Sequence, residues 1–166
     1  MERARGAAEG AAVNPTDTLV RFFVSGVPVP KGSMRAFRLP SSARVVMTHA
    51  NARTKPWQSA VAVAASEARA ALTTHGELTG PLIVRLVFNM PRPKGHYGSG
   101  KNAQKVKAGA PVRPIGKPDL DKLARLVLDA CTSVLWRDDC QVVDLRASKQ
   151  WAAGQPGVHV EVEAGA

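Results

Sequence analysis

The sequence predicts a small α/β domain of the mixed α+β kind, with a mixed sheet of about four strands packed against two main helices. Segments rich in β-branched and aromatic residues alternate with two segments of helical periodicity, in the order strand, helix, strand, helix, strand, strand. The chain has 166 residues, 45% of them hydrophobic, which suffices for one core but is short for two full domains. We therefore expect a single domain over residues 18–166.

The N-terminal part combines a leader, a strand and a basic segment. Residues 1–17 are rich in Ala, Gly and Glu without periodicity, which predicts a disordered leader. A strand is expected over 19–25, and Gly26 with two nearby prolines ends it in a rigid turn. Residues 31–38 are predicted to form a basic loop, closed by a short strand over 44–48.

The remaining elements follow from periodicity and from breaker residues. An Ala-rich segment predicts a helix over 57–74, and a second helical pattern covers 119–133. Residues 82–90 are nearly continuously apolar, which predicts a central strand covered on both faces. Two further strands are expected over 141–151 and 158–163, the last with clean alternation.

The charge of the chain indicates its partner. A net charge of +10 and a pI near 10.3 favour nucleic acid, because a basic surface binds phosphates and releases their counterions. No apolar run approaches the roughly 20 residues that a spanning helix needs. The N-terminus also lacks the continuous apolar stretch of a signal peptide. We therefore expect a cytoplasmic protein with no membrane partner.

The acidic residues are kept apart from the basic ones. Six of the thirteen acids lie between Asp119 and Asp144. The stretches 18–66 and 78–118 contain no acid, yet they hold seven and eight Lys and Arg residues respectively. A group of carboxylates repels a polyanion unless a divalent cation lies between them. This distribution predicts a metal-dependent enzyme that acts on nucleic acid.

Three carboxylates of this region are candidate metal ligands. Pro118 favours an extended residue before it, so Asp119 lies at the entrance of the predicted helix and Asp121 in its first turn. At a helix cap the two can converge, and Asp139 can join them if the next strand begins beside that entrance. Such a site suits one or two Mg²⁺ or Mn²⁺ ions and hydrolysis of a phosphodiester. The alternative is structural, since aspartates at these positions also stabilise any helix or turn.

These residues also resemble a known family. The run 117–123, Lys-Pro-Asp-Leu-Asp-Lys-Leu, is followed by Asp129 and by the run 138–143, Asp-Asp-Cys-Gln-Val-Val, and this arrangement is similar to the RusA family of Holliday junction resolvases, especially its phage-type members. The segment 27–32 and Trp57 resemble that family too. The resemblance covers about residues 19–163. It implies a RusA-like fold and a Mg²⁺-dependent, homodimeric endonuclease that cuts four-way DNA junctions by paired nicks.

The resemblance also implies roles for single residues. The family's catalytic carboxylates fall on Asp119, Asp121 and Asp139, while its catalytic lysine falls on Arg125. Arginine does not release a proton at neutral pH and binds phosphate as a planar fork, so an electrostatic role is expected there. Lys122 is the alternative source of an ammonium group. An ion pair with a neighbouring carboxylate on the helix is the structural alternative for Arg125.

The segment 91–118 is too long for an ordinary connection and is rich in Lys, Arg, Gly and Pro. We expect it to grip DNA near the carboxylates, although such charges also simply solvate a flexible loop. Two other functions remain open: a non-catalytic protein that binds branched DNA, and a nuclease that cuts flaps or other branched nucleic acid. The expected DNA-binding residues are Lys31, Arg35, Lys94, Lys101, Lys105, Lys107, Arg113 and Lys117.

Overall fold

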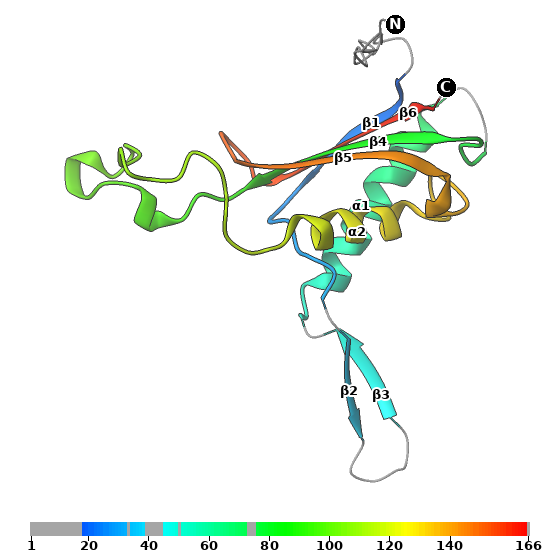
Figure 1. Ribbon diagram of the computed structural model, residues 1–166, viewed down its shortest axis with the longest axis horizontal. Coiled ribbons are helices and arrows are strands. Elements are labelled where there is room, and N and C mark those ends of the chain that lie inside the picture. The colour runs from blue at the N-terminus through cyan, green and yellow to red at the C-terminus, as the bar shows by residue number, and fades with distance from the viewer. Residues whose placement is uncertain (1–17, 33, 39–44, 50, 73–75, 166) are drawn as a thin grey trace, which may run out of the picture.

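The computed structural model describes four strands in one sheet, two helices on that sheet and a separate two-stranded ribbon (Figure 1). The sheet order is β1 (Thr18–Ser25), β6 (Gly157–Ala164), β4 (Leu82–Met90) and β5 (Val142–Trp151). The predicted fold class is confirmed. The expected leader, residues 1–17, lies outside the described residues, which are 18–32, 34–38, 45–49, 51–72 and 76–165.

The two helices, α1 (Thr54–Ala70) and α2 (Leu120–Cys131), pack on the same side of the sheet (Figure 1). Along β4 the residues alternate between buried and half-buried, and Phe88 and Leu86 are among those pointing to the helices. The central position predicted for this strand is confirmed. The expectation that it is covered on both faces is wrong, because both described helices lie on one face and the residues of β4 on the other face are only half-buried.

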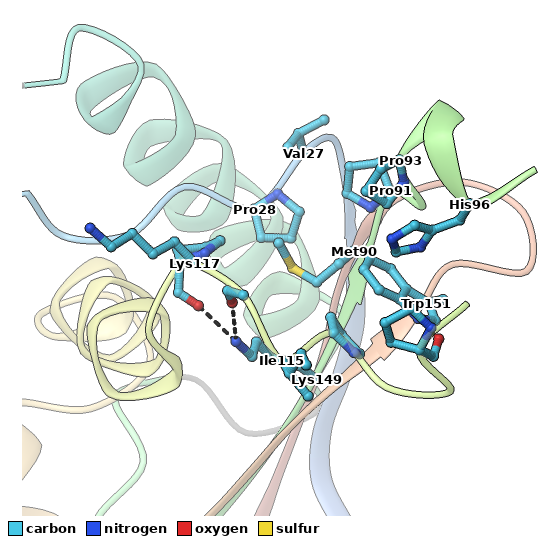
Figure 2. A pocket seen from close by; sticks show the side chains of 14 residues that line it. Val27, Pro28, Met90, Pro91, Pro93, His96, Ile115, Lys117, Lys149 and Trp151 are labelled. Carbon is cyan, nitrogen blue, oxygen red and sulfur yellow. Dashed lines mark hydrogen bonds between the residues drawn. The ribbon is translucent and has the colours of Figure 1, made fainter. Parts of the chain in front are cut away.

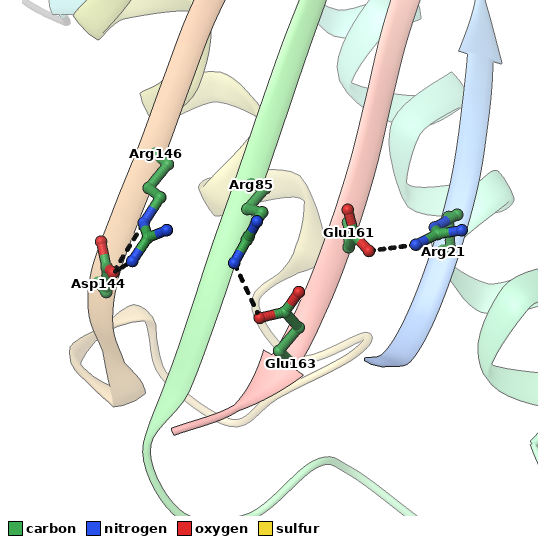
Figure 3. Close-up of polar contacts among 6 residues, drawn as sticks. All are labelled: Arg21, Arg85, Asp144, Arg146, Glu161 and Glu163. Carbon is green, nitrogen blue, oxygen red and sulfur yellow. Dashed lines mark hydrogen bonds and ion pairs between the residues drawn. The ribbon is translucent and has the colours of Figure 1, made fainter. Parts of the chain in front are cut away.

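The face of the sheet away from the helices (the open face) carries charged residues, and the strand register brings acids and bases of neighbouring strands together. Arg85 in β4 reaches Glu163 in β6 at 3.3 Å, and the Glu163 side chain is only 3% exposed. A buried carboxylate needs such a partner, because an unpaired buried charge is strongly unfavourable. Figure 3 shows the three ion pairs of this face, Arg85–Glu163, Arg21–Glu161 and Arg146–Asp144.

The direction of β5 decides where α2 runs. β5 is parallel to β4, so the chain between them must cross the length of the sheet, and it does so through residues 91–118 and α2. Helix α2 begins near the ends of β4 and β5 and finishes near their beginnings (Figure 1). Two contacts fix these positions: Lys149 Nζ to the Pro118 carbonyl at 2.8 Å, and Leu78 N to the Leu135 carbonyl at 2.7 Å.

A hairpin of β2 (Met34–Arg38) and β3 (Val45–His49) projects away from the sheet (Figure 1). The short strand predicted over 44–48 is confirmed with a shift of one residue. The prediction of a basic loop over 31–38 is wrong for residues 34–38, because these residues form β2. A ribbon that stands apart from the sheet needs no continuous apolar pattern, so a segment with two arginines among its five residues gives a weak strand signal.

The long segment 91–118 has a definite path in the structure. It contains two single turns, η2 (Lys94–His96) and η3 (Gly100–Asn102). Its outer part folds back on itself, with Gly98 N donating to the Lys105 carbonyl at 3.0 Å. Neither this segment nor the two helices of the described chain offers a helix long and apolar enough to cross a membrane.

The core between sheet and helices predicts a clear contrast between two substitutions. Leu126 of α2 is 1% exposed, whereas Val143 of β5 is 64% exposed. Leu126→Ala should lower the free energy of unfolding by about 2–5 kcal/mol, because a cavity remains where the side chain was. Val143→Ala should change it by about 0.5 kcal/mol or less. Urea unfolding measures both, and equal losses would contradict the described packing.

Candidate active site at the entrance of helix α2

Asp119 stands at the N-cap of α2 with an extended backbone, φ −68° and ψ 139°. Its carboxylate makes no capping hydrogen bond to the helix. Instead it accepts a hydrogen bond from Lys122 Nζ at 2.6 Å, and both side chains are about half exposed. The structural interpretation of Asp119 as a helix cap is therefore not supported by its side-chain contacts.

A groove of about 370 Å³ opens beside Asp119. Its walls come from the segment 27–30, from the entrance of α2 and from the start of α1, where Arg53 is the N-cap residue. No acidic residue occupies the first turn of α1, so the positive end of that helix is not neutralised. Two helix N-termini and several cations thus border one groove, an arrangement that favours bound phosphate.

The cations hold Asp119 in its charged form. The hydrogen bond from Lys122, followed by the charge of Lys122, lowers the pKa of the Asp119 carboxyl, and the charges of Lys117 and Lys149 lower it further. The same hydrogen bond raises the pKa of Lys122. Asp119 is consequently an exposed, ionised carboxylate, and this is the form of the group that can ligate a hard cation.

Lys149 fixes the segment that leads into Asp119. From β5 its Nζ donates to the carbonyls of Gly116 and Pro118 at 2.9 and 2.8 Å, as the dashed lines in Figure 2 show. Sequence reasoning missed this residue, because nothing in the strand pattern of 142–151 distinguishes it. Arg53 was missed as well. A cation at a helix N-terminus is unfavourable for the helix dipole, so its presence there is a signal of a functional role.

Asp121 and Arg125 lie on the exposed surface of α2, one turn apart. In the described part of the chain, Arg125 forms no ion pair with any carboxylate. The alternative interpretation of Arg125 as a partner for a helix carboxylate is therefore not supported. Its guanidinium is open to solvent and to an approaching phosphate.

Asp139 lies at the other end of α2. It begins the single turn η4 (Asp139–Gln141), which Gln141 holds to the Leu78 carbonyl through a hydrogen bond of 3.0 Å. Helix α2 has twelve residues, so its ends are separated by roughly 18 Å. Among the described residues, no group of three or more His, Cys, Asp or Glu side chains is placed to hold a metal ion. Within one chain, Asp119 and Asp121 therefore lie together at the start of α2, whereas Asp139 lies beyond its other end.

Three of the clustered acids have structural partners. Asp129 of α2 forms an ion pair with Lys31. Lys31 was expected to bind DNA, and its charge is paired with this carboxylate in the structure. Asp138 accepts a hydrogen bond from Cys140 N at 2.9 Å and caps η4. Asp144 pairs with Arg146 at 2.8 Å on the open face of the sheet.

The other expected DNA-binding residues lie on two projections from the sheet. Arg35 belongs to β2, and its side chain lies outside the described residues. Lys107 donates to the Gly95 carbonyl at 2.9 Å but stays exposed. Exposed side chains along the segment 91–118 belong to Lys94, Lys101, Lys105, Lys107, Arg113 and Lys117.

The contact between Lys122 and Asp119 predicts a shift in titration. In Lys122→Met the pKa of the Asp119 carboxyl should rise toward its usual range, because its largest stabilising contact is removed. Lys117→Met should raise it less, since Lys117 acts only through its charge. Carboxyl ¹³C chemical shifts followed against pH measure both effects. An unchanged Asp119 titration in Lys122→Met would show that the ion pair is absent in solution.

Two comparisons with known proteins show the family of this chain. The chain is 33% identical over 147 residues to "Uncharacterized protein YqaN" of Bacillus subtilis (strain 168). The aligned region covers 86% of this chain and 94% of that protein. Residues 25–163 match the family described as Endodeoxyribonuclease RusA, and this match includes the groove, α2 and η4. The chain therefore belongs to the RusA endodeoxyribonuclease family.

Proposed function

We propose that this protein is a Mg²⁺-dependent endodeoxyribonuclease that resolves Holliday junctions by paired nicks, in DNA recombination and repair or in phage DNA processing. The observation that carries the proposal is the ionised, exposed carboxylate of Asp119 in a groove bordered by cations. This carboxylate pairs with Lys122 at the surface and does not cap the helix, whereas a phosphate-cleaving site needs both a cation ligand and a positive surface. Family membership supports the reaction class.

The donor chemistry of the α2 entrance fits a hard divalent cation. Asp119 and Asp121 offer carboxylate oxygens, which Mg²⁺ prefers and Mn²⁺ also accepts. A cation bound there would lower the pKa of a water molecule and stabilise the leaving oxygen of the cut strand. Lys122 has to leave the Asp119 oxygen that it now occupies, and its freed ammonium is then next to the phosphate.

Arg125 and the basic segment bind the DNA in this proposal. Arg125 follows Asp121 by one helical turn and is exposed, so its planar fork can bind two oxygens of one phosphate. Lys117 and Arg53 border the groove and hold neighbouring phosphates. The exposed lysines of the segment 91–118 extend this positive surface along the duplex arms.

Asp139 enters the proposed site from a second copy of the chain. One helix length separates it from Asp119 within a chain, so a twofold axis that brings the end of one α2 beside the start of another would join them. A four-way junction presents two equivalent strands, and a homodimer with two such composite sites matches that symmetry.

The metal site predicts a loss of cleavage with binding retained. Asp119→Asn should slow cleavage of a fluorescent four-way junction about 100-fold or more, since changes even to groups behind a metal ligand cost 10–100-fold. Binding of the junction without metal should persist. Asp144→Asn is the matched control, because Asp144 pairs with Arg146 on the open face and should leave cleavage unchanged.

The same assay separates the alternatives. Flap, single-stranded and duplex substrates compared with the junction reveal which structure is preferred. A protein that binds junctions but never cuts them with Mg²⁺ or Mn²⁺ would be a binding protein, and Asp119→Asn that cuts as fast as wild type would remove Asp119 from the site.

The composite site predicts complementation between two inactive chains. Asp119→Asn and Asp139→Asn should each be inactive alone, yet a mixture should nick junctions at about a quarter of the wild-type rate. Random pairing makes half of the dimers mixed, and each mixed dimer keeps one intact site of two. Nicking is measured with one labelled strand after subunit exchange. If each site were built within one chain, every site in the mixture would carry a substitution and no activity would return.

A further inference from the structure

A second cavity of about 390 Å³ lies next to the groove. The two share part of their lining, and the shared residues include Lys117 and Pro118, which immediately precede Asp119. Its volume lies within the range of small-molecule pockets, roughly 300–1,000 Å³. Any ligand of this cavity is therefore a neighbour of a phosphate bound at Asp119.

The lining combines apolar surface with one aromatic wall. Trp151 provides this wall and is fixed there, since its indole N–H donates to the Pro111 carbonyl at 2.8 Å and Arg92 lies 5.0 Å from its ring centre. Met90 contributes a buried thioether at the base, and Ile115 stands at the lip with 86% of its surface exposed. An exposed apolar side chain at such a lip favours a partly apolar ligand.

One residue of the cavity lining, His96, has a buried ring nitrogen. His96 packs edge-on against Trp151, with ring centres 5.3 Å apart, and Figure 2 shows its ring beside the indole. Its Nδ1 is buried and has no hydrogen bond within the described chain. A buried nitrogen without a partner is costly, so a turn of the His96 ring that brings this nitrogen to the polar edge of a ligand would gain a hydrogen bond.

We propose that this cavity binds an unstacked nucleobase of the strand being cut, next to the phosphate held at Asp119. A base presents an apolar face to the aromatic wall and a polar edge toward His96, and its phosphate meets Lys117 of the shared lining. This inference rests on the proposed function, because it specifies how the same site recognises its DNA. The basic surroundings favour a nucleotide over a neutral ligand.

Single abasic sites test the proposal on a junction bound by the full-length protein in EDTA. Removing one base at a time around the cut position should weaken binding by about 5- to 150-fold at one nucleotide and little elsewhere. In Ile115→Ser this penalty should shrink several-fold, because base and side chain act in one contact. Val112→Ser is the matched control, since Val112 is 85% exposed in the same segment and does not line the cavity.

A second variant tests the polar contact. His96→Phe keeps a ring against Trp151 and removes the nitrogen, so the preference among the four bases at that nucleotide should flatten while the abasic penalty remains. A cavity that merely supports the loop would give no change in base preference.

The outcomes separate this proposal from the proposed function. A protein that cuts junctions with Mg²⁺ but shows the same abasic penalty in wild type and Ile115→Ser overturns the base pocket alone. A protein that neither binds nor cuts junctions overturns the proposed function and the pocket together. Sedimentation provides a further outcome: if Ile115→Ser converts dimers to monomers, the cavity holds a second copy of the chain, and the base pocket is wrong.

Discussion

The two hydrogen bonds from Lys149 to the carbonyls of Gly116 and Pro118 determine where the candidate site lies. Lys149 is close to the end of β5, and Trp151 on the same strand holds the Pro111 carbonyl. One strand thus anchors both ends of the segment 111–118. Without these contacts a long connection would present Asp119 in many positions, and fixing it would cost conformational entropy for each residue. The position of Asp119 therefore depends on the most regular part of the molecule.

The parallel pairing of β4 and β5 places a second constraint on the site. Parallel neighbours need a crossover that returns to the starting edge, and α2 is the returning element. Acids at its two ends are then kept apart by its length, however close they are in the sequence. In the proposed homodimer, a second chain would bring Asp139 to Asp119, and a twofold axis would create two such sites at once. Under the proposed function, the chain topology and the symmetry of a four-way junction favour the same homodimer.

The elements with strong local signals were predictable, and the positions that depend on distant partners were not. The strand β4 and the start of α2 after Pro118 could be predicted from the residues of each segment alone, and both are confirmed. Among the described residues β2 pairs with β3 in a ribbon outside the four-stranded sheet, and its sequence shows no clear apolar alternation. The roles of Lys149 and Arg53 depend on what lies across the fold from them, as does the separation of Asp139 from Asp119. No periodicity encodes such relations.

Lys117 and Pro118 line both the groove and the cavity, so they would connect general DNA binding with the choice of DNA substrate. Phosphate binding by the basic segment acts on every DNA, because charge does not distinguish one duplex from another. A cavity that takes a base acts only where that base can leave its stack, and this costs least where pairing is already disturbed. The branch point of a junction is such a place. In the proposed complex, with the base in the cavity and its phosphate at Asp119, the cations would attract any DNA, and the cavity would restrict cutting to DNA whose stacking is interrupted.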